Sequence, residues 1–230
     1  MEFSRINNFD VLYKGPKSES KMACVILHGY GASFQDLAPL HQYLDKEEAF
    51  HWYFIDAPFS VDIGMGMTGK AWFPIDMMRL QMLISAGKFE EAFYNHDPSG
   101  LSEVTMSMQS VCEEIKSKHE GLILGGFSQG TMLSTSITMN RPELVDGLLL
   151  MSSTVYDRER FDEQGESFKD MPIFQSHGMF DPVLPFNMAQ KLYEILSKYT
   201  EDINFVSFEG GHEIPIDVIQ KAADFLRRFK

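Results

Sequence analysis

Residues 121–140 read GLILGGFSQGTMLSTSITMN, and this stretch decides the fold of the chain. The apolar residues 122–124 predict a short buried strand, and residues 131–140 can continue as a helix. Between the two lies a Gly-x-Ser-x-Gly sequence with Ser128 at its centre. A serine on a sharp turn from strand to helix is the arrangement of a nucleophile elbow. The alternative is a glycine-rich turn whose serine only caps the helix.

Apolar runs of strand length alternate with helical patterns along the rest of the chain. This alternation predicts right-handed crossovers and one α/β domain over residues 1–230, with a mostly parallel sheet and helices on both faces. We expect 9–14 to be an edge strand, and 59–74 and 152–171 to be irregular. The expected strands are 9–14, 22–27, 51–55, 122–124, 145–151, 172–175 and 203–208, and the expected helices are 36–46, 75–86, 88–94, 101–118, 131–140, 186–198 and 215–229.

The composition argues against several classes of partner. The 230 residues include 33 acidic and 20 basic ones, a net charge of −13. Nucleic-acid binding needs a basic face, so we expect no nucleic-acid partner. No apolar run approaches the ~20 residues of a membrane span, and no signal-peptide pattern opens the chain. We therefore expect a cytoplasmic protein without stable membrane insertion, whose two cysteines, Cys24 and Cys112, are reduced.

The loops after three predicted strands carry the residue types of a serine hydrolase. A serine hydroxyl is a poor nucleophile and needs a base, normally a histidine that a carboxylate orients. Beyond Ser128, Asp181 follows one strand and His212 follows another. Because active groups gather at the carboxyl ends of parallel strands, we expect these three side chains to meet. The order Ser, Asp, His along the chain is typical of α/β-hydrolases and differs from the chymotrypsin and subtilisin orders.

Other histidines and aspartates compete for the roles of base and acid. His28 and His177 each precede a glycine at a strand end, where an imidazole can instead hydrogen-bond the backbone and shape the loop. Asp56 also ends a strand, but it precedes Ser128. The other competitors lie on helices, strands or polar segments; they are His41, His51, His96, His119, Asp157 and Asp170. His177 and Asp181 are four residues apart, but without a third ligand we expect no metal site.

The oxyanion that forms when Ser128 attacks a carbonyl needs two fixed hydrogen-bond donors. One should be the backbone N–H of Gln129, the residue after the nucleophile. The other should come from the glycine-rich loop after strand 22–27, and our candidate is the backbone N–H of Tyr30.

The long segment before the helix at 75–86 is expected to lie beside the nucleophile. Trp72 and Phe73 could wall an acyl groove, and Met65 and Met67 could adapt to apolar ligands. The alternative is that these four side chains fill the core beneath the loop.

An apolar cluster follows at residues 77–84 (MMRLQMLI). It could form a lid that contacts lipid, a dimer face or a buried helix, and we favour the buried helix. The sequence allows either a monomer or a homodimer.

With these motifs assembled, the chain resembles the phospholipase/carboxylesterase family of α/β-hydrolases, which includes acyl-protein thioesterases and small bacterial carboxylesterases. The resemblance implies Ser128, Asp181 and His212 as a catalytic triad, Tyr30 and Gln129 as oxyanion donors, and no metal or organic cofactor. The matching motifs are VILHGYGAS (25–33), DAP (56–58), AWF (71–73), GGFSQG (125–130), HGMFDPVLP (177–185) and GGHE (210–213).

Two positions depart from the family pattern. Tyr30 stands where leucine is frequent, and Thr131 where a second glycine is frequent. Tyr30 donates through its backbone, so the oxyanion hole is retained, but its ring could narrow or polarise the acyl entrance.

We expect a serine carboxylesterase acting on small-molecule or lipid esters or thioesters. The alternatives are an acyl-protein thioesterase or lysophospholipase for longer acyl chains, with an acylated protein as one candidate substrate, and a catalytically dead binding protein.

Overall fold

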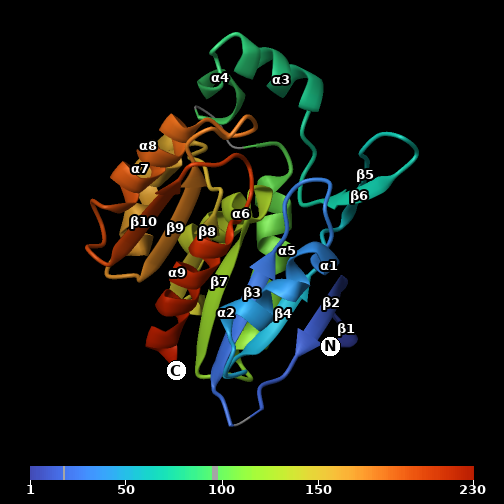
Figure 1. The fold of residues 1–230 in the computed structure, drawn as a ribbon, viewed down its shortest axis with the longest axis vertical. Helices are drawn as coiled ribbons and strands as arrows, with labels where there is room; N and C mark the ends of the chain where they lie inside the picture. Colours follow the sequence, from blue (N-terminus) through green and yellow to red (C-terminus); the bar gives the residue numbers. More distant parts are fainter. Residues whose placement is uncertain (18, 95–97) are drawn as a thin grey trace.

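The computed structural model describes residues 1–17, 19–94 and 98–230, and within them the centre of the molecule is an eight-stranded sheet (Figure 1). The strand order from edge to edge is β1-β2-β4-β3-β7-β8-β9-β10. Neighbouring strands from β4 to β10 are parallel, and β1 and β2 add an antiparallel edge. The strands are β1 (Glu2–Ile6), β2 (Phe9–Lys14), β3 (Met22–Leu27), β4 (His51–Ile55), β7 (Gly121–Phe127), β8 (Gly147–Met151), β9 (Ile173–Gly178) and β10 (Ile203–Phe208).

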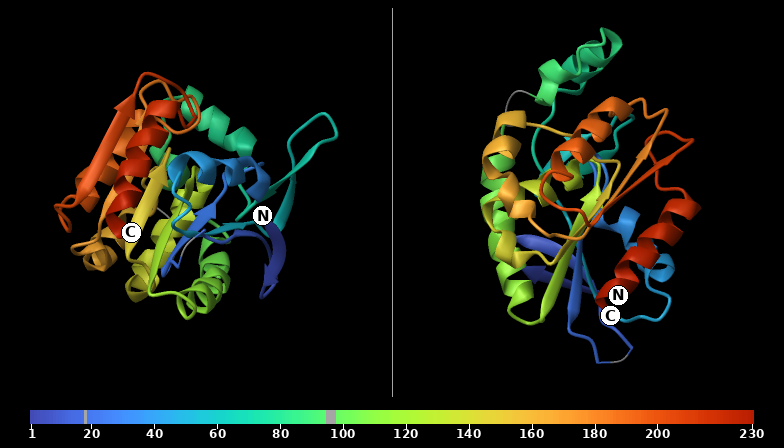
Figure 2. Two further views of the ribbon diagram at one scale, coloured as in Figure 1. Left: turned by 60° about the horizontal axis from the view of Figure 1, so that its bottom comes forward. Right: turned by 90° about the vertical axis from the view of Figure 1, so that its left-hand side faces the viewer.

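Helices cover both faces of this sheet (Figure 2). They are α1 (Phe34–Leu37), α2 (His41–Leu44), α3 (Met77–Ser85), α4 (Glu90–Phe93), α5 (Leu101–Lys116), α6 (Gln129–Asn140), α7 (Arg158–Gln164), α8 (Phe186–Leu196) and α9 (Ile216–Leu226), with 3-10 turns at Ala38–Leu40, Pro142–Leu144, Gly165–Phe168 and Arg227–Phe229. In the part of the chain that the structure describes, no helix has the length and apolar character that crossing a membrane requires.

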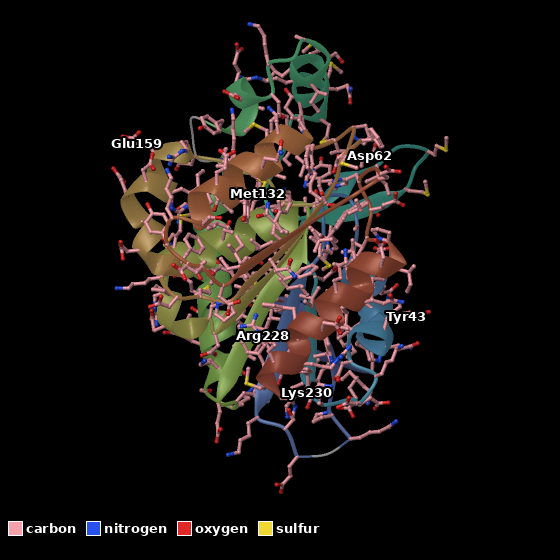
Figure 3. All side chains as sticks on the ribbon, turned by 60° about the vertical axis from the view of Figure 1, so that its left-hand side comes forward. Tyr43, Asp62, Met132, Glu159, Arg228 and Lys230 are labelled. Carbon is pink, nitrogen blue, oxygen red and sulfur yellow. The ribbon has the colours of Figure 1, made fainter. Side chains whose placement is uncertain are left out.

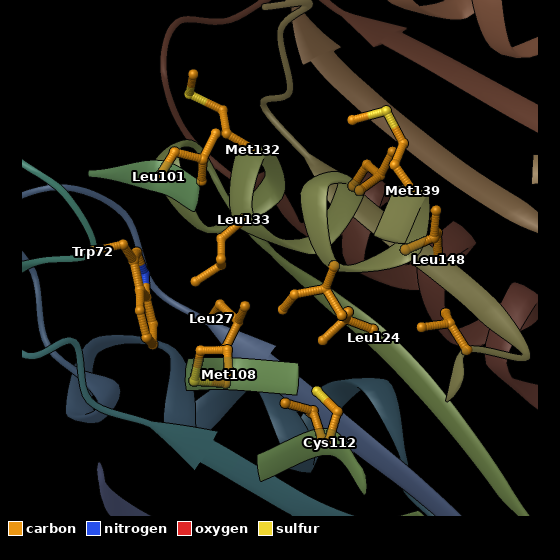
Figure 4. Close-up of a cluster of buried hydrophobic side chains, with 14 of the residues drawn as sticks. Leu27, Trp72, Leu101, Met108, Cys112, Leu124, Met132, Leu133, Met139 and Leu148 are labelled. Atoms are coloured by element: carbon orange, nitrogen blue, oxygen red, sulfur yellow. The ribbon is translucent and has the colours of Figure 1, made fainter. Parts of the chain in front are cut away.

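The core forms two apolar layers because alternate residues of each strand point to opposite faces of the sheet. Val25 and Leu27 of β3 belong to the layer shared with α5, α6 and α8. Cys24 and Ile26 belong to the layer shared with α1, α2 and α9. Figure 4 shows the first layer, in which Leu27 of the sheet lies near Met108 of α5. The predicted α/β fold, with a mostly parallel sheet covered on both faces, is confirmed.

Two segments project from this body at the carboxyl end of the parallel strands (Figure 1). One is the hairpin of β5 (Phe59–Asp62) and β6 (Thr68–Ala71), which occupies the segment expected to be a loop. Figure 3 shows Asp62 on this hairpin, at the opposite end of the molecule from Lys230. The other segment contains α3 and α4.

Helix α3 is not the buried helix that we favoured for residues 77–84. Leu80 is its buried residue, whereas Met77, Met78 and Met82 are exposed. The favoured interpretation is wrong because α3 lies outside the main body, so only one side of it has a surface to pack against.

Three further differences have local causes. Strand β1, whose residues are mostly exposed, pairs outside β2, so residues 9–14 are not an edge strand. The helix expected at 36–46 is divided into α1, a 3-10 turn and α2, with Pro39 as the second residue of the 3-10 turn. Helix α7 lies in the segment expected to be irregular, and Asp157 caps it. The polar turn predicted around His96 lies outside the described residues.

Candidate active site

Ser128 occupies the turn between β7 and α6, with φ 54° and ψ −116°. A non-glycine residue in such a sparsely populated conformation costs on the order of 1–3 kcal/mol, and strain of this kind is concentrated at functional sites. The Ser128 side chain makes no capping hydrogen bond to α6, so the alternative of a simple helix cap does not hold.

The glycines on either side of Ser128 permit close packing of the elbow. A Cβ on Gly126 would lie 2.4 Å from the carbonyl oxygen of Leu27, and one on Gly130 would lie 2.1 Å from the same oxygen. Both distances are far below van der Waals contact. The strand and the helix therefore approach the end of β3 at a distance that any side chain at these positions would prevent.

Asp181 and His212 form a hydrogen-bonded pair at the ends of β9 and β10. His212 Nδ1 donates to Asp181 Oδ2 over 2.6 Å. The other carboxylate oxygen, Oδ1, accepts from the backbone N–H groups of Val183 and Leu184, each at 2.8 Å. A Cβ on Gly178 would lie 2.1 Å from the carbonyl oxygen of Gly211, so the acid and base loops are in close contact.

Opposing influences determine the charge of Asp181. Burial is the largest and raises the pKa of the carboxyl, but the hydrogen bond and charge of His212 and the N–H groups of Leu184 and Val183 outweigh it. The pKa of Asp181 therefore lies below its usual value. The carboxylate is ionised at neutral pH and can stabilise a positively charged His212.

His212 lies next to the elbow through its contact with Phe127, the residue before Ser128. The two rings are 4.7 Å apart between centroids. The hydrogen bonds of the described residues include none between Ser128 Oγ and His212 Nε2, and the His212 Nε2 atom has no other partner among them. Catalytic hydrogen bonds are often long in unliganded enzymes and shorten when the substrate binds.

The backbone N–H groups proposed as oxyanion donors are unoccupied. Within the described residues, neither the N–H of Tyr30 nor that of Gln129 donates to a backbone or side-chain acceptor. The loop of Tyr30 lies beside the nucleophile, since a Cβ on Gly29 would be 3.3 Å from the Cβ of Ser128. Gln129 begins α6, where free N–H groups and the helix dipole favour negative charge.

His28 and His177 have the loop-shaping roles that were considered as alternatives to catalysis. Both are buried. His28 Nδ1 donates to the carbonyl of Gly29 (2.8 Å), and its Nε2 accepts from the N–H of Ala57 (3.0 Å). His177 Nε2 donates to the carbonyl of Leu184 (2.8 Å), and burial lowers the pKa of His177.

The remaining competitors lie elsewhere. The rings of His51 and His119 lie 4.2 Å apart between centroids, tilted by 41°, at the amino end of the parallel strands, opposite the elbow. His41 bonds the carbonyl of Ala38, and Asp170 is exposed. The described residues contain no group of three or more His, Cys, Asp or Glu side chains that could hold a metal ion.

The four residues predicted to line an acyl groove lie in other environments. Trp72 and Phe73 have 0% exposed surface and belong to the core, so the structure corrects the prediction in favour of its alternative. Met65 is 98% exposed and Met67 54%, both between the strands of the projecting hairpin. The prediction for these methionines is wrong as well, and so is its alternative, because an exposed hairpin tip is neither a groove wall nor part of the core.

One feature of the site was missed in the sequence. The side chain of Gln129 hydrogen-bonds the backbone of Trp72 and Phe73, and the Trp72 indole bonds the carbonyl of His28. The available signal was the AWF motif, which we interpreted as a substrate contact because aromatic residues in a presumed loop suggest a groove.

Comparison with known proteins identifies relatives over nearly the whole chain. Residues 11–230 match the family described as phospholipase/carboxylesterase. Acyl-protein thioesterase 1 of Kluyveromyces lactis is 28% identical over 219 residues, covering 91% of this chain and 92% of that protein. The Saccharomyces cerevisiae protein of the same name is 26% identical over 223 residues, covering 91% and 93%.

Solved structures agree in fold. Esterase PE8 aligns with a TM-score of 0.77 at 23% identity, covering 95% of this chain and 98% of that one. Acyl-protein thioesterase 2 of Zea mays aligns with a TM-score of 0.73 at 17% identity, covering 95% and 97%. At these identities the likeness establishes the α/β-hydrolase fold.

Proposed function

Because this chain belongs to the phospholipase/carboxylesterase family and is a hydrolase, we propose that it is a serine carboxylesterase working through an acyl-Ser128 intermediate. The observation that carries the proposal is the Asp181–His212 pair beside a strained serine elbow. Two unoccupied backbone N–H groups next to that elbow support it.

Acylation begins when Ser128 Oγ attacks the carbonyl carbon of the ester while His212 Nε2 takes the hydroxyl proton. The Nδ1 hydrogen of His212 points to Asp181, which leaves Nε2 as the basic nitrogen. The negative oxygen of the tetrahedral intermediate accepts from the N–H groups of Tyr30 and Gln129. When the intermediate collapses, the protonated His212 gives its proton to the departing alcohol or thiol.

Deacylation repeats these steps with water as the nucleophile. His212 takes a proton from the water, whose oxygen attacks the acyl carbon on Ser128. The second tetrahedral intermediate expels Ser128 Oγ, which recovers its proton from His212. The products are a carboxylic acid and the free enzyme, and no step changes an oxidation state.

The decisive test is removal of the nucleophile. Ser128→Ala should reduce p-nitrophenyl acetate hydrolysis by about 10⁶-fold, as expected when a triad nucleophile is lost. It should also abolish covalent labelling by a fluorophosphonate while leaving the circular dichroism spectrum unchanged. Ser134→Ala, on the same helix, is the control and should keep both p-nitrophenyl acetate hydrolysis and fluorophosphonate labelling. Turnover by Ser128→Ala at the original rate would refute the mechanism, and failure of the unaltered protein to be labelled would favour the catalytically dead binding protein.

A thioesterase or lysophospholipase activity on longer acyl chains is a second candidate. The observation in its favour is that several relatives are named acyl-protein thioesterases. Their substrates would be acylated proteins or lipid esters, with the same chemistry at Ser128. Rates for matched oxygen esters and thioesters of increasing chain length distinguish the two: a rate that rises with chain length supports the second candidate, and one that falls supports a short-chain esterase.

A further inference from the structure

Residues 70–73 and the side chain of Gln129 connect the two chain segments that carry the oxyanion donors; we call this group the oxyanion brace. One donor segment is the loop with Tyr30, after β3. The other is the start of α6 at Gln129. The two segments are about a hundred residues apart in sequence, and the brace contacts both of them.

The Gln129 carboxamide provides the first half of the brace. Its Oε1 accepts from the backbone N–H of Trp72 at 2.9 Å, and its Nε2 donates to the carbonyl of Phe73 at 2.7 Å. Both bonds are buried, so water does not compete for these groups. The residue whose backbone N–H faces the oxyanion is thus fixed by its own side chain.

The Trp72 indole and β6 provide the second half. Trp72 Nε1 donates to the carbonyl of His28 at 2.8 Å, two residues before Tyr30. The backbone carbonyl of Lys70 accepts from the N–H of Gly31, and the backbone N–H of Lys70 donates to the carbonyl of Ala32, each at 2.8 Å. The loop that carries the Tyr30 N–H is therefore bonded on both sides of that residue.

We propose that Trp72 and the side chain of Gln129 are positioning residues that hold the backbone N–H groups of Tyr30 and Gln129 at a fixed separation. The inference rests on the proposed serine mechanism. Oxyanion stabilisation depends on donors that are preorganised before the reaction, and misplacement by about 1 Å can reduce the rate about 100-fold. Neither side chain needs to touch the substrate, which is consistent with their burial.

Trp72→Phe tests the indole bond, because it keeps a buried aromatic ring and removes the N–H that binds His28. The matched control is Trp52→Phe. Trp52 is the other tryptophan of the chain, is also buried, and donates its indole N–H to Asp45 at 3.2 Å. Each variant loses one indole hydrogen bond, so a purely structural effect lowers the melting temperature of both.

The informative measurements are kcat, KM and the affinity for a trifluoromethyl ketone, which forms a tetrahedral oxyanion adduct on a catalytic serine. We expect Trp72→Phe to lower kcat and the ketone affinity together, each about 10- to 100-fold, with KM nearly unchanged. Trp52→Phe should change each less than twofold. A folded Trp72→Phe with wild-type kcat and ketone affinity would overturn the inference while the mechanism stands.

Gln129→Met provides an independent test if Trp72→Phe does not fold. It keeps the side-chain length and the backbone N–H but removes both carboxamide hydrogen bonds. We expect the same joint loss of kcat and ketone affinity, and wild-type values would contradict the inference. Absence of ester turnover and of fluorophosphonate labelling in the unaltered protein would instead overturn the proposed function, and this inference with it.

Discussion

The two carboxylate oxygens of Asp181 have different partners: one is held in place by the backbone, and the other orients His212. Asp181 Oδ1 is held by two backbone N–H groups, while Oδ2 receives the Nδ1 hydrogen of His212. This arrangement selects the His212 tautomer whose Nε2 can act as base. Asp181→Asn should therefore lower kcat about 10⁴-fold, because an amide can present N–H to Nδ1 and select the wrong tautomer.

Steady-state kinetics at pH 7 measure this loss, and the rate of fluorophosphonate labelling of Ser128 checks it on the nucleophile itself. Asp170→Asn is the matched control, since Asp170 is an exposed aspartate away from the elbow. Asp181→Asn with kcat within tenfold of the wild type would show that this carboxylate does not orient the base.

At the scale of elements, the β5–β6 hairpin is joined to the oxyanion loop through β6. A Cβ on Gly69 would lie 1.9 Å from the carbonyl oxygen of Gly31, so only glycine allows this approach. Gly69→Ala should push the loop away and lower kcat/KM for p-nitrophenyl acetate about 10-fold or more. Thr68→Ala, next to it on the same strand and exposed, should leave kcat/KM unchanged. A folded Gly69→Ala of full activity would show that this contact does not set the oxyanion hole.

Elements that bury a regular apolar pattern could be predicted from the sequence. Strands β3, β4 and β10 begin and end as expected, because each is an apolar or alternating run with a clear end. The order Ser128, Asp181, His212 indicated where the site residues would meet, since parallel strands end at one edge. Strand β1, the β5–β6 hairpin and α7 were missed because their exposed residues carry little periodic signal.

The environments of individual side chains were harder to predict than the elements. Trp72 and Phe73 belong to a segment expected to be a loop, yet both are buried in the core, and their backbone groups bond Gln129, more than fifty residues away in sequence. The methionines of α3 were expected to be buried and are instead exposed. An apolar cluster predicts burial only where the fold provides a surface to cover it.

For the whole molecule, titrating groups at both ends of the sheet predict sensitivity to acid. At the amino end, burial, His51 and Lys118 lower the pKa of His119 from 6.5 to about 4. At the carboxyl end, burial lowers the pKa of His177, and Asp181 has a pKa below its usual value. In each case the unfolded chain binds protons more readily, so the free energy of unfolding must fall as the pH decreases.

Protonation of His119 and His177 lowers the free energy of unfolding between the ordinary histidine pKa and the lowered pKa of the folded chain. For His119 this range runs from pH 6.5 to about pH 4. Protonation of Asp181 lowers the free energy of unfolding below that range. His119→Gln removes one titrating group while an amide can still hydrogen-bond the Tyr53 hydroxyl, the present partner of His119 Nε2. We expect urea unfolding of this variant to show a shallower loss of stability between pH 6.5 and pH 4 than the wild type. Its kcat/KM at pH 7 should be unchanged, because His119 lies at the amino end of β7, opposite the elbow. Parallel stability curves for the two proteins would show that His119 titrates alike in the folded and unfolded chains.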